Sequence, residues 1–214
     1  MIKAMLFDFG GVLAEEAFKE RLATLGKEKG FDPNYFFNIL SELAYQTGYI
    51  TGSADEHAYW KAVREKTGAK GEDKDLREEV LKRLKLRPEM IKVVNKIKSS
   101  GFIVAILSDQ TNWLDDLNQR TPFYQHFDHV FNSFYIKKTK RDPSLFRDIC
   151  AKLGLKPEEV LFVDDSLDNI KRAANEGLRT IHFKGVNEFE KEIQKFIQIV
   201  SERSSYHEEG TDRL

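Results

Sequence analysis

"KLGLKPEEVLFVDDSLDNIKRAANEGLRTIHF", residues 152–183, is the stretch of sequence that decides the fold. It contains two apolar runs, 160–163 and 179–183, and each of them comes after a helical stretch and a glycine. The runs show no alternation of polar and apolar residues, which is typical of strands covered on both faces. Strand and helix in alternation predict a parallel sheet with right-handed crossover connections.

The same pattern recurs further out along the chain. "SSGFIVAILSD", residues 99–109, again places a glycine before an apolar run, and Gly101, Gly154 and Gly177 fit the left-handed residue that ends a helix. Asp142-Pro143 and Lys156-Pro157 place proline at the first position of two expected helices. The sequence therefore predicts an α/β fold built on a Rossmann-like parallel sheet, with strands near 3–8, 102–107, 129–133, 160–163 and 179–183.

Residues 14–86 differ from the rest, because they hold no convincing strand and several amphipathic helical segments. The apolar positions of these segments are Phe18, Leu22 and Leu25; Phe36, Ile39, Leu40 and Leu43; and Leu76, Val80, Leu81 and Leu84, with a further helix opening at a capping box, Ser53 to Glu56. The predicted division is an α/β core at 1–13 and 87–200, an inserted all-α cap at 14–86 and a polar tail at 201–214.

Composition excludes several classes of function. The 214 residues are 41% hydrophobic and 32% charged with a formal net charge of -1, which implies neither a nucleic-acid nor a membrane partner. The single cysteine, Cys150, cannot form an internal disulfide, and the apolar run 4–9 is too short for a signal or a membrane span. We expect a soluble, cytoplasmic protein, either a monomer or a homodimer.

Polar side chains collect where the predicted strands end. Ligands of an open parallel sheet bind at the carboxyl ends of its strands. The residues that follow the apolar runs are Asp8, Ser108, Asp109, Lys140, Asp164 and Asp165. The sequence therefore predicts four carboxylates, one hydroxyl and one ammonium group at one rim.

This charge pattern favours metal-assisted chemistry on a phosphate. Two like charges 4 Å apart repel by roughly 4 kcal/mol at an effective dielectric of 20, so raised pKa values, the lysine or a bound cation must offset them. Oxygen ligands from Asp8, Asp165 and a backbone carbonyl suit Mg²⁺. Asp8 then becomes a possible nucleophile toward phosphorus, with Lys140 and Ser108 holding the phosphoryl oxygens.

Four segments carry a resemblance to a known family. "MLFDFGGVLA", "VAILSDQ", "KTKRDPSLF" and "VLFVDDSLDNIKRAANEG" resemble the four motifs of the haloacid-dehalogenase-like hydrolases, and residues 14–86 resemble the helical cap of their first subfamily. The resemblance covers essentially the whole chain. It implies that Asp8 is the phospho-accepting nucleophile, Ser108 the motif-two hydroxyl and Lys140 the motif-three lysine. It also implies that Asp165 ligates Mg²⁺ directly, with Asp164 beside it or linked through water, and that the Gly10 carbonyl completes the metal contacts.

Three residues depart from the family pattern. Gly10 stands where the phosphatases usually have a second Asp, a general acid and base typically worth about 10²–10⁴ in rate, although some sugar-phosphate phosphatases of the family, such as the α-glucose-1-phosphate type, also have Gly there. Asp109 replaces an Asn at a substrate-binding position, and a carboxylate is unfavourable near phosphate unless it is protonated, paired or turned away. A solvated or metal-remote carboxylate is the favoured interpretation of Asp109. Arg141 replaces a proline.

The expected function is a Mg²⁺-dependent phosphatase of a small phosphorylated metabolite, acting through a phospho-aspartyl intermediate on Asp8 and slowed by the glycine at position 10. Two alternatives stay open: a metal-independent hydrolase of the 2-haloacid dehalogenase type, and a catalytically weak protein that binds a phospho-ligand or regulates a partner. In the cap, aromatic side chains are either core or substrate contacts, and their helical spacing favours core. These are Tyr45, Tyr49, His57, Tyr59 and Trp60.

Overall fold

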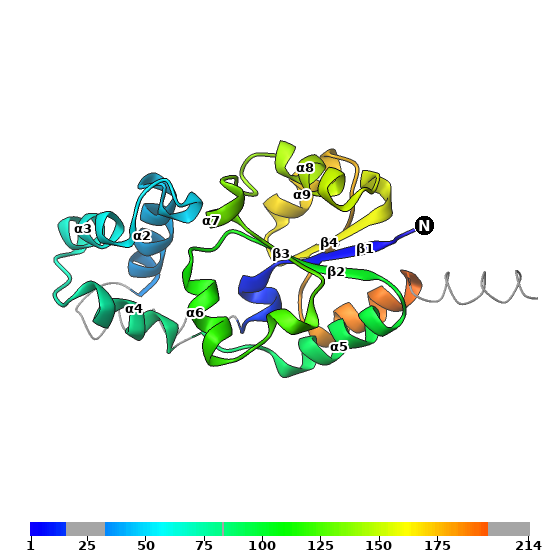
Figure 1. Cartoon of the computed structure of the whole chain (residues 1–214), viewed down its shortest axis with the longest axis horizontal. Coiled ribbons are helices and arrows are strands. Elements are labelled where there is room, and N and C mark those ends of the chain that lie inside the picture. The colour runs from blue at the N-terminus through cyan, green and yellow to red at the C-terminus, as the bar shows by residue number, and fades with distance from the viewer. Residues whose placement is uncertain (16–32, 83, 197–214) are drawn as a thin grey trace, which may run out of the picture.

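The computed structural model describes residues 1–15, 33–82 and 84–196 of the chain and centres on one sheet (Figure 1). The five strands are β1 (Ala4–Phe7), β2 (Ile103–Ser108), β3 (His129–Asn132), β4 (Val160–Asp164) and β5 (Arg179–His182). They pair in the order β3-β2-β1-β4-β5, and all four pairings are parallel. The predicted Rossmann-like α/β class is confirmed, and each strand ends within one residue of its expected bounds.

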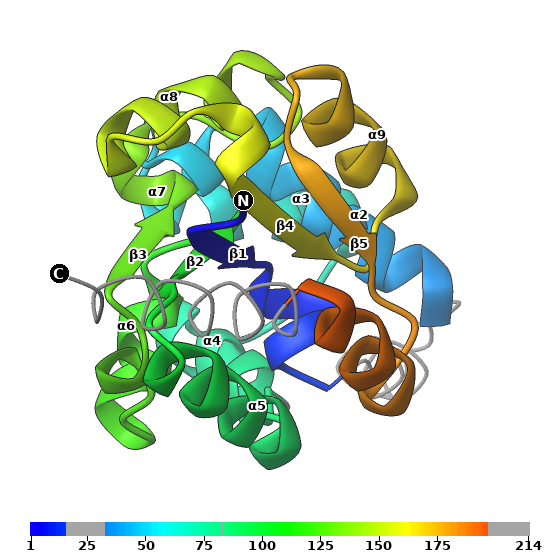
Figure 2. The same cartoon turned by 90° about the vertical axis from the view of Figure 1, so that its right-hand side faces the viewer.

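Helices cover both faces of the sheet. They are α5 (Pro88–Ser99), α6 (Trp113–Arg120), α7 (Ser133–Ile136), α8 (Ser144–Leu153), α9 (Leu167–Asn175) and a helical stretch at 186–196. Figure 2 shows α8 and α9 on one face, with α5 and the 186–196 stretch on the other. None of the described helices is long and apolar enough to cross a membrane.

The core forms two layers, one on each side of the sheet. Met5 and Phe7 of β1 pack into the layer that contains Val94 of α5, whereas Leu6 packs with Phe146 of α8 in the other layer. Successive side chains of a strand point to opposite faces, so one strand feeds both layers. Cys150 is buried in the second layer. Burial on both faces explains why the strands read as unbroken apolar runs.

A helical segment lies between β1 and β2 in the sequence, at the carboxyl ends of the strands (Figure 1). It consists of α2 (Pro33–Gln46), the short turn Tyr49–Thr51, α3 (Glu56–Thr67) and α4 (Asp73–Leu81). The segment has its own buried cluster, which includes Tyr49, Tyr59 and Trp60 and which Trp113 of α6 joins. The helix expected around Phe18, Leu22 and Leu25 and the tail at 201–214 lie outside the described residues, so the domain bounds stay a prediction.

Three local expectations about helix starts are wrong, while the helix ends are confirmed. Helix α8 begins at Ser144, so Pro143 is its N-cap residue and not its first helical residue. Pro157 begins a single 3₁₀ turn, Pro157–Glu159, because β4 follows at Val160 and leaves no room for a helix. The N-cap of α3 is Asp55, whose carboxylate accepts the Ala58 N–H at 2.8 Å, and not a box opened by Ser53. The glycines at 101, 154 and 177 all adopt positive φ, at 87°, 67° and 92°.

Candidate active site

Asp8 lies at the carboxyl end of β1, where the strand gives way to the turn Phe9–Leu13. Its Oδ1 accepts hydrogen bonds from the Phe9 backbone N–H at 2.7 Å, the Ser108 hydroxyl at 2.7 Å and the Lys140 ammonium at 2.8 Å. Oδ2 accepts none from the part of the chain that the structure describes. One oxygen is therefore fixed by three donors, and the other is left to meet a ligand.

Lys140 lies between two carboxylates and is 2% exposed. Its ammonium group is 2.8 Å from Asp8 Oδ1 and 2.7 Å from Asp164 Oδ2. Burial alone would lower the pKa of Lys140, but the charges of Asp8, Asp164 and Asp109 outweigh it and raise that pKa above its usual range. Lys140 therefore stays protonated and can hold an anionic oxygen.

The Asp8 carboxyl has a pKa well above its usual range. Burial is the largest cause, and the charge of Asp164 adds to it, while Lys140 opposes both. Asp164 is itself held by the Ser166 backbone N–H at 2.7 Å and by the Asn169 amide, which contacts both of its oxygens. Sequence reasoning gave Asn169 no role, and the structure shows that it fixes the orientation of Asp164.

Three carboxylates meet at this point. Asp8, Asp164 and Asp165 each offer an oxygen, and these oxygens lie within 4.8 Å of one another. A hard divalent cation such as Mg²⁺ prefers such carboxylate oxygens, so the donor set fits the expected metal. The roles of these residues and of the Gly10 carbonyl as ligands stay predictions.

The two glycines after Asp8 differ in their surroundings. Gly11 has φ +78°, and a Cβ at this position would lie 2.1 Å from Asp165 Oδ2, so only glycine lets the turn approach β4 this closely. Gly10 has φ -69° and ψ 130°, a conformation open to any residue, and the nearest atom to a Cβ here would be Gln110 Nε2 at 3.9 Å. The fold therefore requires glycine at position 11, whereas at position 10 there is open space for a side chain.

Asp109 is half-buried and hydrogen-bonded, so it is not a freely solvated carboxylate, and it lies outside the cluster of Asp8, Asp164 and Asp165, which agrees with the metal-remote alternative. It accepts the Lys140 backbone N–H, at 3.0 Å to Oδ1 and 3.2 Å to Oδ2, and the Tyr45 hydroxyl donates to Oδ2 at 2.8 Å. The negative charge is thus paired, and it holds the backbone of Lys140 in place. Contact of Asp109 with a substrate stays a prediction.

Tyr45 and Arg141 were not recognised as part of this site. Arg141 places its guanidinium 3.5 Å from the centre of the Tyr45 ring and pairs with Glu42 at 2.9 Å. Tyr45 lies 64 residues from Asp109 in the sequence, so the hydrogen bond between them could not be predicted from the helical spacing of the aromatic residues. The replacement of proline by Arg141 was the available signal.

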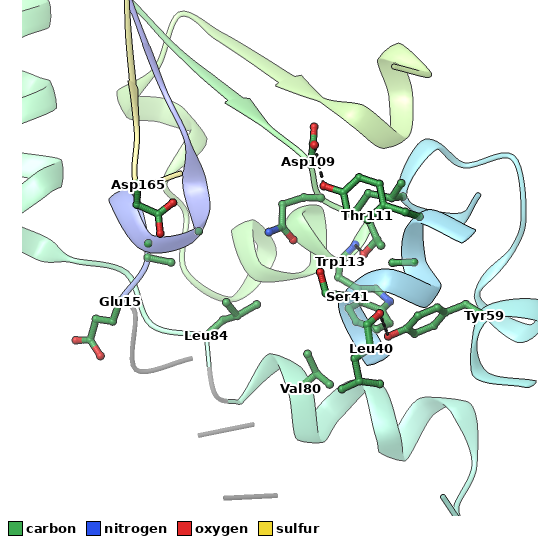
Figure 3. Close-up of a pocket in the computed structure, with 17 residues that line it drawn as sticks. Glu15, Leu40, Ser41, Tyr59, Val80, Leu84, Asp109, Thr111, Trp113 and Asp165 are labelled. Atoms are coloured by element: carbon green, nitrogen blue, oxygen red, sulfur yellow. Dashed lines mark hydrogen bonds between the residues drawn. The ribbon is translucent and has the colours of Figure 1, made fainter. Parts of the chain in front are cut away.

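A cavity of about 250 Å³ opens beside the acidic cluster (Figure 3). Gly10, Gly11, Asp109 and Asp165 from the strand ends line it together with side chains of the helical segment. Figure 3 shows Asp165 at one side and Leu40 and Tyr59 at the far side. The rim of the sheet and the helical segment therefore enclose one space.

Comparison with known proteins gives relatives in several classes of hydrolase. The chain is 26% identical over 216 residues to "Bifunctional epoxide hydrolase 2" of Sus scrofa, covering 91% of this chain but 38% of that protein, so it spans well under half of that relative. It is 33% identical to "(S)-2-haloacid dehalogenase 4A" of Burkholderia cepacia, over 47% of this chain and 44% of the relative. It is 26% identical to "Glyceraldehyde 3-phosphate phosphatase" of Methanopyrus kandleri, over 86% and 84%.

A similar fold occurs in a solved structure of a HAD family enzyme from Bacteroides thetaiotaomicron in complex with magnesium and inorganic phosphate. It superimposes with a TM-score of 0.67 at 23% identity, covering 86% of this chain and 95% of the other. This likeness shows a shared fold.

The family itself follows from the match along the sequence. The family described as haloacid dehalogenase-like hydrolase matches residues 2–177, which include the Asp8, Ser108, Lys140 and Asp164–Asp165 positions and the helical segment. The chain therefore belongs to the haloacid dehalogenase-like hydrolases.

Proposed function

We propose that the protein is a Mg²⁺-dependent phosphatase of a small phosphorylated metabolite, with Asp8 as the nucleophile. The observation that carries the proposal is the asymmetry of Asp8, because three donors fix Oδ1 while Oδ2 accepts no hydrogen bond from the described residues. Asp8 also shares the carboxylate cluster with Asp164 and Asp165. A nucleophilic carboxylate needs one oxygen held in position and the other free to attack.

The reaction would proceed in two displacements at phosphorus. In the first, Asp8 Oδ2 attacks the phosphorus, an aspartyl phosphate forms, and the P–O bond to the alcohol breaks. In the second, water attacks the same phosphorus and releases inorganic phosphate, which restores the Asp8 carboxylate. The Lys140 ammonium and the Ser108 hydroxyl, which both contact Asp8, would stabilise the phosphoryl oxygens as negative charge shifts onto the leaving group.

The carboxylates of Asp8, Asp164 and Asp165 would hold the magnesium ion, and a cation there would supply charge neutralisation for the phosphoryl group. The fit rests on the oxygen-only donor set and on the short distances among these groups. At position 10 the chain carries no acid, so the proton that the leaving alcohol needs comes from water. We therefore expect slow turnover of esters with poor leaving groups.

The test is hydrolysis of p-nitrophenyl phosphate with Mg²⁺ and with excess chelator. We expect turnover only with Mg²⁺, and none in Asp8→Asn, which keeps the size of the side chain but loses the nucleophilic oxygen. Asp168→Asn is the matched control, because Asp168 is an exposed acid on the first turn of α9 and lies outside the carboxylate cluster. Turnover that survives chelation, or that persists in Asp8→Asn, would reject the proposal.

The dehalogenase alternative keeps two observations in its favour: Gly10 leaves no second acid next to Asp8, and one relative carries the name of a haloacid dehalogenase. The buried Asp164, joined to Lys140 and Asn169, favours the phosphatase, because an attack on carbon has no need for a cation site. Chloride release from 2-chloropropionate in the presence of chelator would decide for the alternative.

A further inference from the structure

The cavity changes its chemical character along its length. Near the rim of the sheet it is lined by Asp109, Gln110 and Asp165, where the phosphoryl group would be held. The rest of its lining is mainly apolar, with Glu15, Ser41 and Thr111 as polar members, and its apolar residues come from six different elements or loops. These apolar residues are Leu40, Ala44, Ile50, Tyr59, Val80, Leu84 and Trp113.

The hydroxyl groups of the two tyrosines in this lining are already in use. The Tyr59 hydroxyl donates to the Leu40 carbonyl at 3.2 Å, and the Tyr45 hydroxyl donates to Asp109. The Tyr59 hydroxyl points toward Leu40 among the other lining residues (Figure 3), where its hydrogen is already engaged. A polyol in this space would meet mainly apolar side chains, with the Ser41 hydroxyl and the Trp113 Nε1 donor, which has no partner among the described residues, as polar contacts. Hydroxyls that stay unpaired are costly to bury.

The charges of the described lining residues also favour an uncharged ligand. No lysine, arginine or histidine is found among the described residues that line the cavity. Lys140 lies behind the rim, where its ammonium contacts Asp8 and Asp164. The described wall therefore offers no cation to a second phosphate or to a carboxylate on the substrate.

The apolar wall is also well packed. Trp113 stacks on Trp60, with ring centres 5.6 Å apart and planes at 22°, and meets the ring of Tyr59 edge to face at 5.8 Å. These rings belong to the buried cluster of the helical segment, so the shape of the wall is set before a ligand binds. A preformed apolar pocket selects for ligands that fill it without polar groups.

We propose that the preferred substrate is the phosphate monoester of a small, uncharged and mainly apolar alcohol, whose carbon chain lies in this part of the cavity. The proposal rests on the proposed phosphatase function and specifies its substrate class. It differs from the sugar-phosphate class that the glycine at position 10 suggests, because a sugar would place several hydroxyls against apolar side chains.

The first experiment compares three esters on the same three-carbon skeleton: propyl phosphate, glycerol 1-phosphate and 3-phosphoglycerate. We expect kcat/KM to be highest for propyl phosphate and lowest for 3-phosphoglycerate, although glycerol is the better leaving group of the two neutral alcohols. A chain-length series from ethyl to hexyl phosphate should rise by up to roughly fourfold per methylene, the factor that corresponds to about 0.8 kcal/mol, until the cavity is full.

Two variants locate the effect in the cavity. Leu84 lines it and Leu86 does not, although both are half-buried leucines of the same connecting stretch. We expect Leu84→Ser to flatten the chain-length dependence and Leu86→Ser to retain it. Competitive inhibition of p-nitrophenyl phosphate hydrolysis by propyl- and pentylphosphonate gives the same comparison as a binding measurement that needs no turnover of the alkyl esters.

The outcomes separate the two proposals. Mg²⁺-dependent hydrolysis of p-nitrophenyl phosphate, combined with a preference for glycerol 1-phosphate or a flat chain-length series, overturns the substrate class and leaves the phosphatase intact. Equal flattening in Leu84→Ser and Leu86→Ser also overturns it. Absence of hydrolysis for every ester, p-nitrophenyl phosphate included, overturns both.

Discussion

Gly10 and Gly11 stand side by side after the nucleophilic position, yet the structure gives them different reasons to be glycine. Gly11 is required by its φ of +78° and by Asp165, whose Oδ2 would lie 2.1 Å from an added Cβ. Gly10 has neither constraint, since its backbone is extended and its surroundings are open. The fold would therefore accept an acidic residue at position 10, and the absence of one is not imposed by the backbone or by neighbouring atoms.

We predict that Gly10→Asp folds and gains activity. A carboxyl group here would donate a proton to the departing alcohol, a function typically worth about 10²–10⁴ in rate, and we expect a gain of roughly 10–100-fold in kcat for propyl phosphate. The gain should be small for p-nitrophenyl phosphate, because p-nitrophenolate leaves without a proton. The ratio of the two rates is the measurement.

Gly11→Asp is the control for this experiment, and we expect it to lose activity because the side chain collides with Asp165. If Gly10→Asp is folded by circular dichroism and its ratio of alkyl to aryl rates equals that of the wild type, then the space beside residue 10 does not adjoin the leaving group.

At the scale of elements, α2 is joined to the loops that follow β2 and β3. Tyr45 of α2 donates to Asp109, and Asp109 in turn accepts the backbone N–H of Lys140. Glu42, one turn earlier on α2, pairs with Arg141. The helical segment therefore supports Lys140 through the carboxylate of Asp109. This explains Asp in place of Asn at position 109, because both of its oxygens accept hydrogen bonds.

These two contacts should contribute unequally to stability. Tyr45→Phe removes the donor to a half-buried carboxylate but keeps the ring beneath Arg141, and we expect it to cost about 1–2 kcal/mol of unfolding free energy. Glu42→Gln weakens a pair whose side chains are each 49% exposed, so we expect a cost under about 0.5 kcal/mol. Urea denaturation of the two variants measures both; a larger loss in Glu42→Gln would contradict this order.

Sequence reasoning succeeds on this chain where the determinant is local. Buried parallel strands appear in the sequence as apolar runs, and helix ends carry glycine at positive φ. The carboxyl ends of the strands in a parallel sheet share one edge, so the residues after the strands could be grouped from the sequence alone. These residues are Asp8, Ser108, Lys140 and Asp164. Sequence reasoning fails where the determinant is a tertiary contact, as for Tyr45 with Asp109. It also fails for Pro157, because a helix start and a single turn begin with the same residues.

At the scale of the whole molecule, the carboxylate cluster joins the two halves of the sheet. Asp8 comes from β1, and Asp164 and Asp165 come from the end of β4, more than 150 residues later in the sequence (Figure 2). Folding gathers these acids within 4.8 Å, and their mutual repulsion opposes the native state. A cation that binds only the folded arrangement should therefore stabilise the entire protein.

We predict that Mg²⁺ raises the melting temperature. A ligand at 100 times its Kd stabilises the folded state by about 2.7 kcal/mol, and for a chain of 214 residues this corresponds to a rise of roughly 5–10 °C. Differential scanning fluorimetry with Mg²⁺ and with chelator measures the shift. Asp165→Asn should lose it, since one of the three oxygen donors becomes an amide, whereas Asp168→Asn, an exposed acid of α9, should retain it. An equal shift in both variants would mean that the ion acts elsewhere on the surface, and the carboxylates at the strand ends would then be explained by the contacts they make within the protein.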